Sequence, residues 1–207
     1  MAVITFPSTL NIKTMRWERM DQDVTFRSVF GVQSAAQISP LWKANLTFNE
    51  LSDAEAGAYQ SLIMQLDGAK NQLALWNAGR PTPLGTYTGA SGTTTAGAAS
   101  VGATSLVLTN AAYAACTLLE GDYIGVNQSS GVTQQVVMVT ANATANGSGV
   151  ITVSVKPALR NAVSGGSTVL LQYPKVLFRQ QSSTSGWDYE RATVSGFSLD
   201  LLEDPRS

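Results

Sequence analysis

Apolar and polar residues alternate along several stretches of the chain, and a period of two is the pattern of half-buried β-strands. The clearest stretch is 42–49, in which every even-numbered residue is apolar and every odd-numbered residue is polar. Two further alternating stretches, 9–17 and 24–30, flank the polar segment 18–23. They predict a long β-ribbon near the N-terminus, with a turn in the polar segment.

One helix is predicted between two strands. Ser52-Asp53-Ala54-Glu55 has the spacing of a capping box, in which the first and last side chains satisfy free backbone N–H groups at a helix start. An apolar stripe then recurs at helical spacing, and Gly68 supplies a stop. The stripe consists of Tyr59, Leu62, Ile63 and Leu66. The apolar run 73–76 follows as a buried strand, so we expect the helix to pack on a sheet.

A second group of short strands is predicted in the middle of the chain, separated by turn sequences such as Glu120-Gly121-Asp122. The candidates are 105–109, 123–126, 134–140, 149–155 and 168–172. This spacing suits a small β-barrel of OB-like or related type. Two more strands, 176–181 and 191–202, come after Pro174. Because one hairpin is not stable alone in water, we expect them to rejoin the strands before residue 84.

A break in composition divides the chain. Residues 85–104 are almost entirely Gly, Ala, Ser and Thr, which bury little apolar surface, so a loosely packed connector is expected there. The prediction is a discontinuous first domain, 1–84 plus 174–207, that carries an inserted β-barrel domain, 105–173. The fold class is mainly β with one helix, and the first domain is expected to be β-sandwich-like with a long N-terminal ribbon.

The surface is expected to carry few charges, because charged residues make up 13% of the chain and hydrophobic residues 44%. Such a low charge favours a protein that is covered by partners in an assembly. Lys and Arg number 13 against 14 Asp and Glu, with no long run of either sign, so no nucleic-acid-binding stripe is visible. The chain also lacks an apolar run of about 20 residues and a signal-peptide pattern. We therefore expect a soluble protein, made in a reducing cytoplasm, without membrane insertion.

Reactive side chains are scarce. Cys116 is the only cysteine and the chain has no histidine, which excludes intramolecular disulfides, Cys or His metal clusters and Ser-His-Asp sites within one chain. Glu120 and Asp122 fit a turn better than an acid–base pair. Asp188 and Glu190 are the remaining candidates for acid–base chemistry, but no convergent groups accompany them. We therefore expect no enzyme activity and no catalytic, cofactor or metal site.

Exposed aromatic and arginine residues are the better candidates for function, since Trp, Tyr and Arg dominate protein interfaces. Trp42 and Trp76 fall on buried strand faces and are expected to lie in the core. The remaining tryptophans fall near ribbon ends or loops. The predicted subunit-interface residues are Arg16, Trp17, Phe26, Phe30, Trp187 and Tyr189, with Arg19 and Arg27 as additional ribbon arginines. Solvated ribbon positions explain the arginines equally well.

The order of elements resembles that of the distal tail proteins of long-tailed bacteriophages and of related tail-tip hub proteins. The resemblance rests on the N-terminal ribbon, strand 42–48, capped helix 52–66 and strand 73–76, followed by an inserted segment and two return strands. Within the inserted segment it rests on Leu118–Ile124, Val136–Thr140, Gly149–Val153 and Lys156–Arg160, and at the close on Phe178-Arg179 and Phe197–Glu203.

The resemblance implies a structural virion protein rather than an enzyme. Such proteins form a hexameric ring at the distal end of the tail tube and join it to the hub, fibres or receptor-binding proteins. The first domain would form the ring and the inserted domain would project outward. Partners would be other copies of the chain and other tail proteins, at the virion tail tip and in the host cytoplasm during assembly. The alternative is a carbohydrate- or receptor-binding module of a virion.

Overall fold

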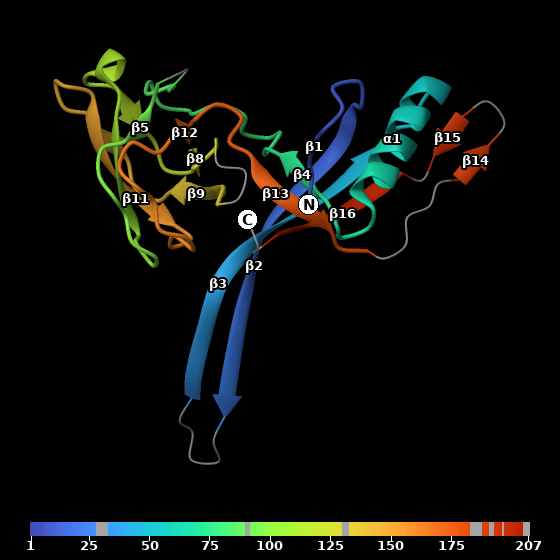
Figure 1. The fold of residues 1–207 in the computed structure, drawn as a ribbon, viewed down its shortest axis with the longest axis horizontal. Helices are drawn as coiled ribbons and strands as arrows, with labels where there is room; N and C mark the ends of the chain where they lie inside the picture. The colour runs from blue at the N-terminus through green and yellow to red at the C-terminus, as the bar shows by residue number, and fades with distance from the viewer. Residues whose placement is uncertain are drawn as a thin grey trace.

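The computed structural model describes residues 1–27, 33–89, 92–129, 133–182, 188–190, 193–195 and 197–204, with the side chains of 22–38 and 183–196 left undescribed. The fold is mainly β with one α-helix, as predicted from the sequence (Figure 1). The helices are α1 (Asp53–Leu66) and the 3₁₀ helix η1 (Ala111–Tyr113). The strands are β1 (Val3–Thr5), β2 (Ile12–Arg27), β3 (Gln33–Phe48), β4 (Gln72–Leu75), β5 (Thr94–Thr95), β6 (Ser105–Thr109), β7 (Thr117–Leu118), β8 (Tyr123–Val126), β9 (Gln135–Val139), β10 (Ala143–Thr144), β11 (Val150–Lys156), β12 (Val169–Leu170), β13 (Val176–Gln180), β14 (Asp188–Glu190), β15 (Thr193–Ser195) and β16 (Ser198–Glu203).

The first sheet combines strands from both ends of the chain. Its six strands lie in the order β1-β4-β13-β16-β3-β2, and every pair is antiparallel except β1 with β4. β13 and β16 therefore fill the centre of the sheet, between strands that precede residue 76. This first unit is one six-stranded sheet with one helix on it and the two-stranded hairpin of β14 and β15, where the sequence led us to expect a sandwich-like pair of sheets.

β2 and β3 form a long ribbon, and each strand has 16 residues. The turn predicted at 18–23 is wrong, because β2 continues through this polar segment to Arg27. Its charged side chains pair with each other, as Arg16 does with Glu18 and Arg19 with Asp21. An edge strand accepts such residues because their heads remain in water.

The outer half of the ribbon leaves its sheet. β16 pairs with β3 only from Lys43 to Thr47, so the part of β3 from Gln33 to Trp42 has β2 as its single partner among the described strands. At a rise of about 3.3 Å per residue, this part is about 30 Å long. Figure 1 shows the two strands running away from the rest of the molecule. The outer edge of β2 is also an edge of the sheet.

Helix α1 covers one face of the first sheet. The carboxylate of Glu55 accepts hydrogen bonds from the backbone N–H and the hydroxyl of Ser52, which bears out the predicted helix start. The buried residues are the predicted stripe together with Ala56. The helix ends at Leu66, and Asp67 takes the left-handed conformation one residue before the predicted Gly68 stop.

Tyr59 of α1 gives the protein a pH dependence in the alkaline range. Burial raises the pKa of its phenol from 10.0 to about 12, and its hydroxyl donates to the Ser198 carbonyl at 2.8 Å. Between these two pH values the unfolded chain loses the proton while the folded chain keeps it, so stability falls as pH rises. Tyr59→Phe is expected to flatten that fall in urea unfolding from about pH 9 to about pH 11.5. An equally steep fall in the variant would contradict this role of Tyr59.

The second sheet, with strand order β12-β8-β9-β11-β6-β5, is built from the middle of the chain. Its ladder is open rather than the closed barrel expected from the sequence. One isolated bridge between Thr94 and Thr168 brings its two ends together. The N–H of Val169 donates to the Thr93 carbonyl, and the N–H of Thr95 donates to the Ser167 carbonyl. Its core is separate and contains mainly valine, leucine and isoleucine.

The tract 85–104 differs from the loose connector that its composition indicated. Tyr87 is fully buried in the core of the second sheet, and Thr93 and Thr95 are also buried. The Thr95 hydroxyl donates to the Ser164 carbonyl at 2.7 Å, and β5 pairs with β6. These small, hydroxyl-bearing residues are held in place by backbone hydrogen bonds and by the buried ring of Tyr87, which provide the stabilising contacts that large apolar side chains provide elsewhere.

Candidate functional site

An aromatic cluster joins the two sheets. Trp17 of β2, Trp42 of β3 and Phe178 of β13 come from the first sheet, and Tyr123 of β8 comes from the second. The ring centroids of the two tryptophans lie 5.9 Å apart, and the Tyr123 ring lies 6.3 Å from that of Trp17 and 5.7 Å from that of Trp42. Phe178 meets Trp17 edge-on at 5.3 Å. We call these four residues the junction cluster.

Buried polar contacts reinforce the junction cluster. The indole N–H of Trp42 donates to the Val136 carbonyl of the second sheet at 2.8 Å. Glu203 at the end of β16 accepts from the backbone N–H of Trp42 and from the guanidinium of Arg160, both at 2.9 Å. The side chain of Glu203 is 3% exposed and that of Arg160 17%. This ion pair therefore fixes a loop of the second sheet onto two strands of the first.

The two chain crossings between the sheets are also tied down. Asp122 is buried and accepts from the backbone N–H groups of Leu84 at 2.7 Å and Leu119 at 2.8 Å, which supports its predicted role as a turn residue. Gln128 and the backbone of Lys175 exchange two hydrogen bonds of 3.1 and 3.0 Å where the chain returns to β13. Both sheets are thus held in one orientation.

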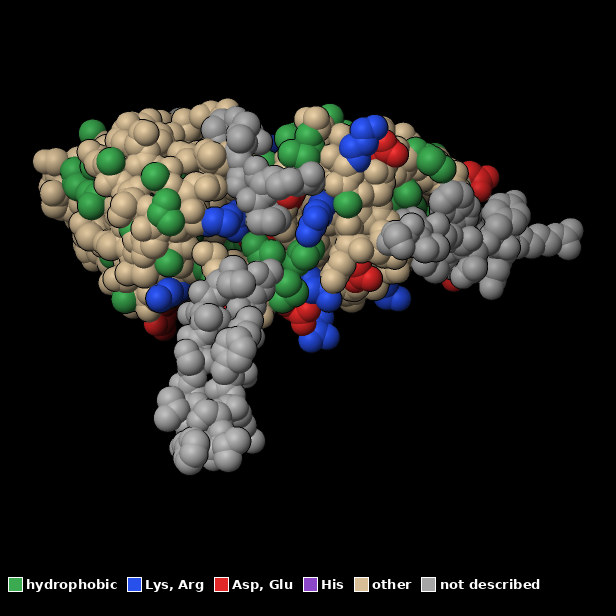
Figure 2. All heavy atoms as spheres, turned by 60° about the horizontal axis from the view of Figure 1, so that its bottom comes forward, with side chains coloured by type: hydrophobic (Ala, Val, Ile, Leu, Met, Phe, Trp, Pro, Cys, Tyr) green, Lys and Arg blue, Asp and Glu red, His purple; other side chains and the backbone are tan. Residues whose placement is uncertain are grey.

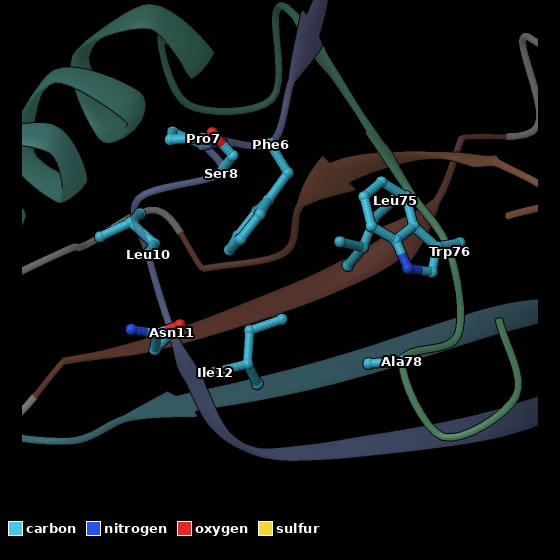
Figure 3. A pocket seen from close by; sticks show the side chains of 9 residues that line it. All are labelled: Phe6, Pro7, Ser8, Leu10, Asn11, Ile12, Leu75, Trp76 and Ala78. Carbon is cyan, nitrogen blue, oxygen red and sulfur yellow. The ribbon is translucent and has the colours of Figure 1, made fainter.

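An apolar pocket opens on the first sheet, where β4 ends and the segment between β1 and β2 passes by (Figure 3). We call it the Trp76 pocket. Its volume is about 400 Å³, and none of its lining residues is charged. It is lined by Phe6, Pro7, Ser8, Leu10, Asn11, Ile12, Leu75, Trp76 and Ala78. A turn positions Ala78, since the N–H of Gly79 donates to the Asn77 side chain and the N–H of Arg80 donates to the Asn77 carbonyl.

Trp76 differs from its prediction as a core residue, because it is only half-buried. One side of its indole borders the pocket, and its ring meets the half-exposed ring of Tyr173 at 5.4 Å. Trp76 directly follows the last residue of β4, where a side chain is no longer covered by the neighbouring strands of the sheet. Trp42, in the middle of its strand, is buried as predicted.

The predicted interface residues lie in different settings. Arg16 is exposed on β2, with 77% of its side chain accessible, and pairs with Glu18. Trp17 is half-buried in the junction cluster, so a charge introduced there would disturb the contact between the sheets before it reported on any subunit contact. The side chains of Phe26 and Tyr189, and all of Phe30 and Trp187, lie outside the described residues, as do the side chains of Asp188 and Glu190.

The sequence reasoning missed the partners of Trp42 in the second sheet and the ion pair of Arg160 with Glu203. One feature of the sequence could have indicated the Arg160 pair. The segment from 84 to 173 has only four charged residues, so each of them is a candidate for a specific structural role. They are Glu120, Asp122, Lys156 and Arg160. Asp122 is buried and Arg160 is paired, which leaves the surface of the second sheet almost uncharged (Figure 2, left half).

Within the described ranges, no three Cys, His, Asp or Glu side chains gather closely enough to hold a metal ion. Nor does any helix in the part that the structure describes have the length and hydropathy to cross a membrane. No family model matches the chain, and neither does any curated protein.

Proposed function

We propose that this chain is a structural component of a bacteriophage tail tip, which forms a ring that joins the tail tube to the hub, fibres or receptor-binding proteins. The observation that carries the proposal is the ribbon of β2 and β3, which extends about 30 Å beyond its last sheet partner. The proposed hexameric stoichiometry comes from the resemblance of the element order to that of distal tail proteins. No catalytic role is part of this proposal.

A projecting ribbon needs a partner for physical reasons. Two strands alone are only marginally stable in water, and the outer edge of β2 has no strand partner in the part of the chain that the structure describes. The other edge of the sheet is β1, with only three residues. In the proposed ring the β2 edge of one copy meets a different surface of the next copy, and such contacts between unlike surfaces close into rings when the rotation permits.

The second sheet suits a role in presenting partners. Its surface carries almost no charge, and the junction cluster with the Arg160–Glu203 pair fixes its orientation on the first sheet. A neighbour bound there would keep a defined position relative to the ring. In this proposal the chain is made in the host cytoplasm and works in the virion.

The mass of the native particle tests the proposal. We expect light scattering to give a hexamer and negative stain to show rings. Replacing residues 23–37 by Asn-Gly, a two-residue hairpin turn, shortens the ribbon at the Gln22–Ile38 pair. This variant is expected to be monomeric and to stay folded. Its circular dichroism signal, divided by the number of strand residues that remain, should match that of the unmodified chain. Wild-type chains that are monomeric both alone and within their particle would refute the ring.

A carbohydrate- or receptor-binding module is the second candidate. It is favoured by the hydroxyl-rich, nearly uncharged surface of the second sheet and by the half-exposed rings of Trp76 and Tyr173. Aromatic faces of this kind stack on sugars and also anchor protein partners. A monomer that binds glycans would favour this candidate, and a stable ring without glycan affinity would remove it.

A further inference from the structure

We propose that Asn146 is a site of spontaneous deamidation, at which the folded chain converts a side-chain amide into aspartate and isoaspartate. The chain itself is the substrate and water is the co-reactant. Asn146 is followed by Gly147, and no other asparagine in the sequence precedes a glycine. The inference does not depend on the proposed ring, because it concerns the covalent chemistry of a single chain.

The turn that joins β10 to β11 holds the backbone of Asn146 and leaves its neighbour accessible. The N–H of Asn146 donates to the Val150 carbonyl at 2.9 Å, and its carbonyl accepts from the N–H of Gly149 at 3.0 Å. Asn146, Gly147 and Ser148 are exposed. A Cβ at Gly147 would meet no described atom within 4 Å beyond its chain neighbours. Water therefore reaches both groups that react.

Two backbone N–H groups polarise the amide that is attacked. The side-chain oxygen of Asn146, Oδ1, accepts from the N–H of Ser148 at 2.9 Å and from that of Val150 at 3.0 Å. Negative charge develops on this oxygen during the attack, and donors that already bind it stabilise that charge, as in an oxyanion hole. The nucleophile is the backbone nitrogen of Gly147, whose N–H donates to no acceptor among the described residues. No hydrogen bond therefore has to break before it reacts.

The reaction exchanges one C–N bond for another and then hydrolyses the product. The Gly147 nitrogen loses its proton to hydroxide and bonds to Cγ of Asn146, while the side-chain nitrogen takes up a proton and leaves as ammonia. The product is a five-membered succinimide ring. Water that adds at Cγ breaks the new bond and gives aspartate, whereas water that adds at the backbone carbonyl carbon breaks the original peptide bond and gives isoaspartate. Either product adds one negative charge to the second sheet, whose surface carries almost none.

The following glycine distinguishes Asn146 from Asn77, which has a similar turn. The side chain of Asn77 accepts from the N–H two residues later, that of Gly79, at 2.9 Å, as Asn146 does from Ser148. The residue after Asn77 is Ala78, however. Its Cβ crowds the nitrogen and restricts the backbone, whereas glycine does neither. We therefore expect Asn146 to react and Asn77 to remain an amide, so the chain contains its own control.

Peptide mass spectrometry of the folded chain after incubation at mildly alkaline pH tests the site. The peptide that contains Asn146 is expected to gain the mass difference between an amide and a carboxylic acid, and an isoaspartate-specific methyltransferase should label it. The rate should rise with pH, because the Gly147 nitrogen attacks only after it has lost its proton. Gly147→Ala is expected to slow the reaction at least about 10-fold. The peptide that contains Asn77 should keep its mass.

A parallel incubation in urea separates the effect of the fold from that of the sequence. Deamidation at Asn146 in the urea-unfolded chain but not in the folded chain would mean that the turn protects the amide, and it would overturn the inference. Equal rates at Asn77 and Asn146 in the folded chain would also overturn it, because Gly147 would then have no special role. Reaction of the folded chain at Asn146 alone, slowed by Gly147→Ala, is the result that supports the site.

Discussion

Glu203→Ala is expected to lower the free energy of unfolding by about 3–5 kcal/mol, because it leaves the guanidinium of Arg160 buried without its counter-charge. The carboxylate also accepts the backbone N–H of Trp42, which would lose its partner in the same variant. Urea unfolding followed by tryptophan fluorescence measures the loss. A change under about 0.5 kcal/mol, the size typical of surface substitutions, would show that the pair is solvated.

A double variant separates the ion pair from the space that it fills. Arg160→Met with Glu203→Met removes both charges and keeps apolar volume, so it is expected to recover most of the lost stability. Equal losses in the single and double variants would instead assign the effect to packing or to the Trp42 hydrogen bond. Arg160→Met alone leaves the carboxylate of Glu203 buried and should resemble Glu203→Ala.

Trp42→Ala is expected to cost about 3–5 kcal/mol, since it removes the ring that touches both Trp17 and Tyr123 and leaves a cavity between the sheets. The Val136 carbonyl also loses its donor. We expect unfolding to separate into two transitions, one for each core, in calorimetry. A single transition with unchanged midpoint would mean that Trp42 does not couple the sheets.

Trp42→Phe is the matched control for that variant. It keeps an aromatic ring in the cluster and removes the N–H that reaches Val136, so the expected cost is about 1–3 kcal/mol for the unsatisfied carbonyl. One cooperative transition should remain, because the ring still links the sheets. A cost as large as that of the alanine variant would give the hydrogen bond the main role.

Local periodicity predicted the elements that depend on local physics. The alternation over 42–48 and the helical stripe from Tyr59 to Leu66 were confirmed, because burying one face of a strand or helix dictates the spacing of its apolar residues. The polar run 18–23 was wrongly predicted to be a turn, because its residues suit a turn and an edge strand equally well. Only the pairing of β2 with β3 decides between the two.

Contacts between distant residues could not be predicted in this way. The alternation of β2 and β3 gives Trp17 and Trp42 a common face, but it does not say that Tyr123 of the second sheet covers it. Arg160 and Glu203 lie 43 residues apart, and no spacing rule connects them. The composition of 85–104 likewise hid its packing, because threonine hydroxyls and backbone groups form the stabilising bonds there.

The central position of β16 determines when the first sheet can close. β3 leaves the ribosome long before β16, its neighbour in the first sheet, so the sheet stays incomplete until β16 has been synthesised. The second sheet draws its strands from the middle of the chain alone and is free to form earlier. Pairing of strands so distant in sequence is slow, which makes closure of the first sheet the late step. Chains truncated before β16 therefore lack a finished first sheet, whereas their second sheet can already be complete.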